Sequence, residues 1–121
     1  MFYEDIFSRL NKQGIKYLVA GGVAVNLHGF VRATMDLDII LLLEDVNVGK
    51  FIALVRDAGF KPRVPVDLDA FAVSAKRAEW IDEKGMLVFG VYNPANSLEQ
   101  IDVMIDPVID FADLASRCET A

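Results

Sequence analysis

Two stretches of the sequence carry most of the information about the fold: Ala20-Gly21-Gly22-Val23-Ala24 and Arg32-Ala33-Thr34-Met35-Asp36-Leu37-Asp38-Ile39-Ile40-Leu41. The first predicts a glycine turn that enters a short helix, and the second predicts a strand that carries two carboxylates. Side chains at positions i and i+2 of a strand point to the same face of the sheet. We therefore expect Asp36 and Asp38 to lie side by side.

The strand that holds these two acids continues into an apolar run at 39–43. Such a run is typical of a strand buried on both faces, where a lone carboxylate would be costly. At a separation of roughly 6 Å and an effective dielectric constant near 20, two carboxylates repel by about 3 kcal/mol. A divalent cation would remove this repulsion, and oxygen ligands favour Mg²⁺. The alternative interpretation of the pair is a solvated strand end.

The composition describes a single globular domain over residues 1–121, because 54% of the residues are hydrophobic and their spacing is periodic. The net charge of −6 argues against non-specific binding to the phosphate backbone of DNA or RNA. Cys118 is the only cysteine and His28 the only histidine, so neither an internal disulfide nor a closed zinc site is expected. No signal peptide and no apolar run of membrane-spanning length is evident, so we expect a cytoplasmic protein without a membrane partner.

The hydrophobic periodicity predicts helices and strands that alternate, followed by two strands in succession. This order indicates the α/β (α+β) class, with a small mixed β-sheet flanked by helices. A helix is expected to begin near Asp67, but Trp80 does not lie on its apolar stripe. We therefore expect a break in this helix near Ala78. Helices are expected over 2–11, 21–27, 48–58, 67–76 and from 111, and strands or extended segments over 17–20, 34–43, 60–64, 86–92 and 100–105.

The glycine pair Gly21-Gly22 lies between an expected strand and an expected helix. Two glycines allow a phosphate group to approach the backbone, and the N-terminus of the helix offers free N–H groups. A tight turn without a ligand is the alternative. The two acids that follow soon afterwards favour a phosphate cradle beside a carboxylate pair.

A third acid, Asp102, lies within an expected strand between Ile101 and Val103. Aspartate is depleted in strands, so its presence indicates either a solvated sheet face or a function. Beside the first pair it could bind a metal ion and accept the proton of an attacking hydroxyl. Arg32 and Thr34 directly precede the pair, and Arg32 could contact a triphosphate. Taken by itself, Arg32 favours a surface charge or a partner for Asp36 over that contact.

Four further residues have ordinary structural interpretations. His28 is expected at a helix end, and Trp80 at the edge of the core rather than under a nucleobase. Lys76 and Arg77 are expected on a solvated helix face.

Together these motifs resemble the nucleotidyltransferase superfamily with the polymerase-β-like catalytic core, including AbiEii-type toxins and minimal nucleotidyltransferases. The segment 17–29 looks like the glycine turn and helix of that family, and Asp36-Leu37-Asp38 looks like its Asp-x-Asp strand. The segments 86–89 and 100–103 resemble its later strands, with Asp102 at the position of the third carboxylate. The resemblance covers nearly the whole chain and implies the nucleotidyltransferase fold.

The resemblance further implies a Mg²⁺-dependent enzyme that transfers NMP from an NTP to an acceptor hydroxyl. Two Mg²⁺ ions would be held by Asp36, Asp38 and Asp102, and the nucleotide by Gly21, Gly22, Arg32 and Thr34. The acceptor would be a protein side chain, an RNA end or a small molecule. The family context implies a toxin–antitoxin or phage-defence system and a partner protein encoded nearby.

Two departures from the family pattern keep an alternative open. Gly22 stands where many members have serine, and the sequence ends at Ala121 where related chains continue with another strand and a basic helix. We therefore expect a chain that is either truncated at its C-terminus or a minimal form with a weakened substrate site. The alternative function is a non-catalytic, antitoxin-like protein-binding module with a degenerate nucleotidyltransferase fold.

Overall fold

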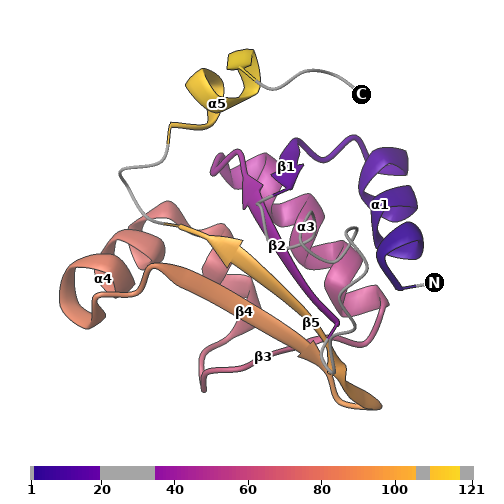
Figure 1. Cartoon of the computed structure of the whole chain (residues 1–121). Helices are drawn as coiled ribbons and strands as arrows, with labels where there is room; N and C mark the ends of the chain where they lie inside the picture. Colours follow the sequence, from indigo (N-terminus) through magenta and orange to yellow (C-terminus); the bar gives the residue numbers. More distant parts are fainter. Residues whose placement is uncertain (1, 20–34, 106–109, 118–121) are drawn as a thin grey trace.

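Five strands form one mixed β-sheet in the order β1-β2-β5-β4-β3 (Figure 1). The structure is a computed structural model, and it describes residues 2–19, 35–105 and 110–117. The central strands β2 (Met35–Leu41) and β5 (Asn96–Met104) are parallel, and the other neighbouring pairs are antiparallel. The edge strands are β1 (Tyr17–Val19) and β3 (Lys61–Pro62), and β4 (Val88–Asn93) lies between β5 and β3. The predicted α/β (α+β) class is confirmed.

The helices follow the apolar stripes of the sequence and end at residues that favour helix termination. They are α1 (Phe2–Lys12), α3 (Asp45–Asp57), the 3-10 helix η1 (Leu68–Ala72), α4 (Ser74–Lys84) and α5 (Phe111–Arg117). Gly14 after α1 and Gly85 after α4 have positive φ angles of 66° and 62°, which glycine adopts without strain. Helix α3 begins three residues before the predicted start at Val48.

The hydrophobic core lies between one face of the sheet and the helices. Along β2 the side chains of Leu37, Ile39 and Leu41 are fully buried, whereas the alternating Asp38 and Ile40 are only partly buried. Phe51 and Val55 of α3 belong to the same buried cluster, as do Ile6 and Leu10 of α1. The prediction that the run 39–43 is buried on both faces is therefore wrong, because Ile40, Leu42 and Leu43 are only partly buried.

A stack of three aromatic rings extends the core under β4. The ring of Phe71 lies 4.1 Å from that of Phe89, and the ring of Trp80 lies 5.7 Å from that of Phe89, measured between centroids. Trp80 is 5% exposed, which agrees with its expected place in the core. The helix break predicted near Ala78 is instead at Val73, whose extended backbone (φ −96°, ψ 116°) separates η1 from α4. This break resets the helical phase, so Trp80 faces the core.

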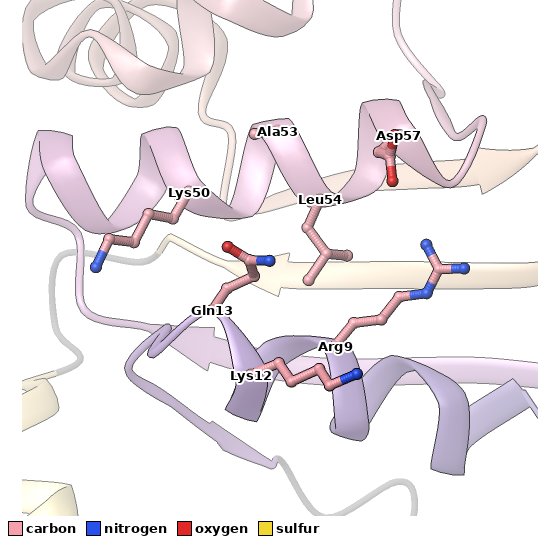
Figure 2. Close-up of a pocket in the computed structure, with 7 residues that line it drawn as sticks. All are labelled: Arg9, Lys12, Gln13, Lys50, Ala53, Leu54 and Asp57. Carbon is pink, nitrogen blue, oxygen red and sulfur yellow. The ribbon is translucent and has the colours of Figure 1, made fainter.

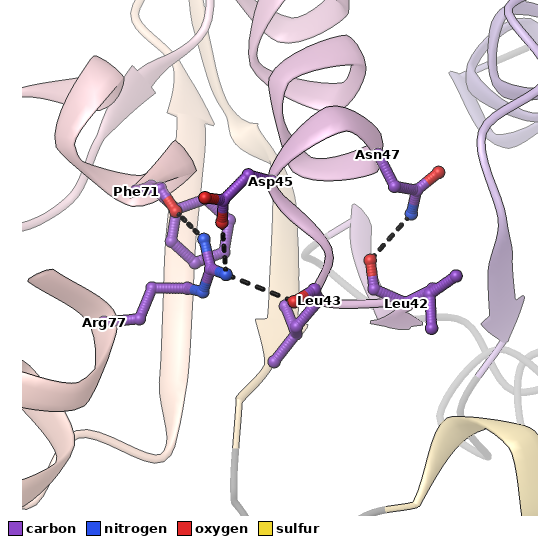
Figure 3. A network of polar contacts seen from close by, with 6 residues as sticks. All are labelled: Leu42, Leu43, Asp45, Asn47, Phe71 and Arg77. Atoms are coloured by element: carbon purple, nitrogen blue, oxygen red, sulfur yellow. Dashed lines mark hydrogen bonds and ion pairs between the residues drawn. The ribbon is translucent and has the colours of Figure 1, made fainter. Parts of the chain in front are cut away.

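The solvated position predicted for Arg77 is also wrong, since its side chain is 4% exposed. Its guanidinium donates hydrogen bonds to the carbonyls of Phe71 (2.6 Å) and Leu43 (3.2 Å) and contacts Asp45 Oδ1 at 3.1 Å (Figure 3). Burial of this charge is possible because every contact supplies an oxygen acceptor. Lys76 is exposed, as predicted, and pairs with Glu79.

Asn47 makes a second buried polar link, between α3 and the strands β1 and β2. Its side chain is 7% exposed and bonds both the N–H (2.8 Å) and the carbonyl (3.0 Å) of Lys16. Its amide also donates to the carbonyl of Leu42 at 2.9 Å (Figure 3). These bonds hold the start of α3 against the ends of two neighbouring strands. Among the helices of the described ranges, none has the length and apolar character needed to span a bilayer.

Candidate functional site

The two predicted site residues Asp38 and Asp102 are neighbours on the central strands. Asp38 in β2 pairs in register with Asp102 in β5, and the strands are parallel. Paired residues of neighbouring strands project from the same face of a sheet. Both side chains are partly buried, and they alternate with the buried core residues Leu37 and Ile101. The structure therefore places both carboxylates on the face opposite the hydrophobic core.

Asp36 precedes Asp38 by two residues in β2 and pairs with Gln100 of β5. The backbone of Asp36 belongs to β2, as the Asp-x-Asp pattern predicts. Its side chain lies outside the described part of the structure. The predicted nucleotide-binding residues Gly21, Gly22, Arg32 and Thr34 lie in the segment 20–34, outside the described residues. The predicted helix at 21–27 and His28 lie there too.

The carboxylates of Asp38 and Asp102 have the donor chemistry that Mg²⁺ prefers, because both offer only oxygen ligands. Their strand positions fit a shared ion, since residues in register on adjacent strands are close neighbours. Within the described side chains, no three Asp, Glu, His or Cys residues come together as a metal site. A third ligand would have to come from outside the described side chains, and Asp36 is the candidate that the sequence predicts.

Sequence reasoning missed Arg63, which follows β3 and contacts Asp102. Its Nη2 lies 2.6 Å from Asp102 Oδ1, and its Nη1 donates a 2.7 Å hydrogen bond to Gln100 Oε1. The side chain of Asp102 is 19% exposed and that of Arg63 is 38% exposed, so the ion pair is partly shielded from solvent. The two residues are far apart in the sequence and meet only because β3, β4 and β5 are neighbours.

Gly90 of β4 makes room for this ion pair. It pairs in register with Asp102, and the backbone N–H of Arg63 donates to its carbonyl at 3.0 Å. A Cβ atom at position 90 would collide with the guanidinium of Arg63. A glycine inside an apolar strand often marks a place where another group approaches the backbone closely. The glycine in Val88-Phe89-Gly90-Val91 could therefore have predicted such an approach from the sequence.

A separate groove lies between α1 and α3 (Figure 2). It has a volume of about 550 Å³ and contains none of the predicted site residues. Its lining has more cations than anions, which favours anions over metal ions. The groove is on the helical side of the sheet and is therefore separate from Asp38 and Asp102. It is lined by Arg9, Lys12, Gln13, Lys50, Ala53, Leu54 and Asp57.

Comparisons with protein-family models, with curated proteins and with solved structures gave no match for this chain. The chemical interpretation of the site therefore depends on its own residues. In the described part of the chain these are two carboxylates in register, one paired arginine, and the glycine that admits this arginine.

Proposed function

We propose that this protein is a nucleotidyltransferase that moves NMP from an NTP to an acceptor hydroxyl with two Mg²⁺ ions. The observation that supports this most is the pairing of Asp38 with Asp102 across parallel strands, on the face opposite the core. Two acids that are remote in sequence but adjacent in space are costly without a cation or a donor between them. The resemblance of Asp36-Leu37-Asp38 and of Asp102 to the polymerase-β-like pattern supplies the reaction.

In this proposal Asp36, Asp38 and Asp102 hold the metal ions, and Asp102 also accepts the proton of the acceptor hydroxyl. When bound, the ions would neutralise the triphosphate and the leaving pyrophosphate. Gly21 and Gly22 would cradle phosphate, with Arg32 and Thr34 beside them. The acceptor is a protein side chain, an RNA end or a small molecule. The protein would act in the cytoplasm, in a toxin–antitoxin or defence system with a partner encoded nearby.

The direct test is transfer of label from each α-³²P-labelled NTP, with Mg²⁺ and a total cell lysate as the source of acceptors. The wild-type protein should label an acceptor, and Asp38→Asn should abolish the labelling because it removes a metal ligand. Asp82→Asn is a matched control, since Asp82 is an exposed residue of α4. The proposal fails if no NTP yields labelled product, or if both variants lose activity equally while folded.

The ion pair between Arg63 and Asp102 favours a second candidate, a protein-binding module without catalysis. A carboxylate that is already neutralised by an arginine can be a structural element of the sheet. This candidate predicts tight binding of a protein encoded nearby and no NTP binding at millimolar Mg²⁺. A thermal-shift titration with NTP and Mg²⁺ separates the two candidates, because only the enzyme should be stabilised by the nucleotide.

A further inference from the structure

We infer that Arg63 is a built-in counter-cation for Asp102, and that it weakens the binding of a divalent cation to the same carboxylate. The inference rests on the metal site of the proposed function and names a residue that regulates access to it. In the metal-free protein the guanidinium of Arg63 compensates the negative charge of Asp102. In the metal-bound protein Mg²⁺ would compensate that charge.

The contact geometry identifies the two cations as competitors. Arg63 Nη2 lies 2.6 Å from Oδ1 of Asp102, which is within the distance of a charge-assisted hydrogen bond. A Mg²⁺ ion binds a carboxylate oxygen at about 2.1 Å, so on this carboxylate it would lie close enough to the guanidinium for the two positive charges to repel each other. Asp102 Oδ1 is buried while its side chain as a whole is 19% exposed, so the guanidinium holds the oxygen that solvent does not reach. The metal ion and the arginine therefore compete for one carboxylate.

A second side-chain contact, to Gln100, holds Arg63 at this position. Gln100 accepts a 2.7 Å hydrogen bond from Nη1, so both terminal nitrogens of the guanidinium are engaged. Gln100 in turn donates to the carbonyl of Ser97 at 3.1 Å, which orients its amide. Two engaged nitrogens fix the guanidinium plane, in the manner of the fork geometry that arginine favours.

The ion pair between Arg63 and Asp102 can form because Gly90 has no side chain. The guanidinium occupies the space where a side chain at position 90 would begin. Any larger residue at this position would displace the flexible end of Arg63 while leaving both charged groups in the protein. Substitution of Gly90 therefore provides a way to break the ion pair without removing a charge.

The test is a titration of the nucleotide-free protein with Mn²⁺, a spectroscopic substitute for Mg²⁺, followed by electron paramagnetic resonance. Arg63→Gln and Gly90→Ala should each bind Mn²⁺ about fivefold more tightly than the wild type, the effect expected for loss of a partly exposed ion pair. Arg56→Gln is the matched control, because Arg56 forms an ion pair of 2.7 Å with Asp69 and is exposed. It should leave the affinity unchanged.

The outcomes separate a specific competition from general electrostatics. An equal increase in Arg56→Gln, or an increase in Arg63→Gln without one in Gly90→Ala, would overturn the inference. If Gly90→Ala does not fold, as judged by circular dichroism, Gln100→Leu takes its place because it removes the acceptor of Nη1. A merely structural arginine would change the melting temperature and leave the Mn²⁺ affinity as it was.

The same variants distinguish this inference from the proposed reaction. Tighter Mn²⁺ binding in both variants without any NMP transfer would support the competition and contradict the reaction. Unchanged Mn²⁺ affinity in a protein that transfers NMP would overturn the competition alone. Absence of Mn²⁺ binding from every variant would overturn both.

Discussion

Arg77 donates a 2.6 Å hydrogen bond to the carbonyl oxygen of Phe71, which ties the first turns of α4 to the 3-10 helix η1. The same guanidinium reaches Leu43 and Asp45 at the junction between β2 and α3 (Figure 3). One buried cation thus joins the consecutive elements η1 and α4 to the junction between β2 and α3, which lies 32 to 34 residues earlier in the sequence. Its carbonyl acceptors depend on it, since each would lose this donor if the arginine were removed.

The Arg77 contacts predict a large loss of stability in Arg77→Met. This change keeps the aliphatic stem but removes the donors to Phe71 and Leu43, and it should lower the free energy of unfolding by about 3 kcal/mol. Lys76→Met, at an exposed position of the same helix, should change it by less than about 0.5 kcal/mol. Urea unfolding followed by circular dichroism measures both. Equal effects would show that the Arg77 contacts contribute little.

Asn47→Ala should lower the free energy of unfolding by about 2 kcal/mol, because it removes three hydrogen bonds from a buried side chain. The freed backbone N–H of Lys16 would also exchange its hydrogen with solvent more rapidly. Asn11→Ala is the control, since the side chain of Asn11 accepts a hydrogen bond from the hydroxyl of Tyr17 at an exposed site. Urea unfolding and amide exchange measured by mass spectrometry check the prediction. A smaller loss in Asn47→Ala than in the control would contradict it.

The two site aspartates should respond differently to neutralisation in the absence of metal. Asp38→Asn should leave the metal-free protein as stable as the wild type or slightly more stable, because it removes repulsion from the neighbouring acids. Asp102→Asn should lower the free energy of unfolding by about 1 kcal/mol, because it removes the charge that pairs with Arg63. Unfolding in urea with EDTA gives both values. Strong destabilisation by Asp38→Asn would indicate that Asp38 is a structural partner.

The stability of the protein should fall at alkaline pH through Tyr17. Burial raises the pKa of its phenol above the ordinary value of 10.0, and the hydrogen bond to Asn11 opposes this rise more weakly. The unfolded chain therefore releases the proton at a lower pH than the folded protein. The contribution of Tyr17 is fully present below pH 10 and is lost as the pH rises through the folded pKa.

Tyr17→Phe should remove this part of the pH dependence. The difference in unfolding free energy between wild type and variant should be constant at pH 8–9 and should shift in favour of the variant above about pH 10. Urea unfolding at each pH provides the values, and absorbance at 295 nm follows the ionisation directly. A constant difference over the whole range would contradict the assigned burial effect.

Much of the secondary structure could be predicted from local patterns. The apolar spacing placed α1 and the strands β1, β2, β4 and β5 within a few residues, and Gly14 and Gly85 mark helix ends at positive φ angles. The helix around Trp80 was harder to predict from the sequence. The side of this helix on which Trp80 lies depends on where the helix begins, which is set by the extended residue Val73. Nothing in the side chain of Val73 forbids a continuous helix, so only packing of Phe71 and Trp80 around Phe89 selects the break.

Local sequence patterns suffice to predict the mixed class, the helical and extended segments, and the alternation that puts Asp38 and Asp102 on polar positions of their strands. These features depend on the period of side chains along one segment, which is a local property. Tertiary contacts place Asp38 beside Asp102, bring Arg63 across Gly90 to Asp102, and bury Arg77. The first two depend on which strands become neighbours and in which register, and the third depends on how α4 packs against η1 and the start of α3. That choice is made by burial of the shared core, which brings together residues that no local pattern connects.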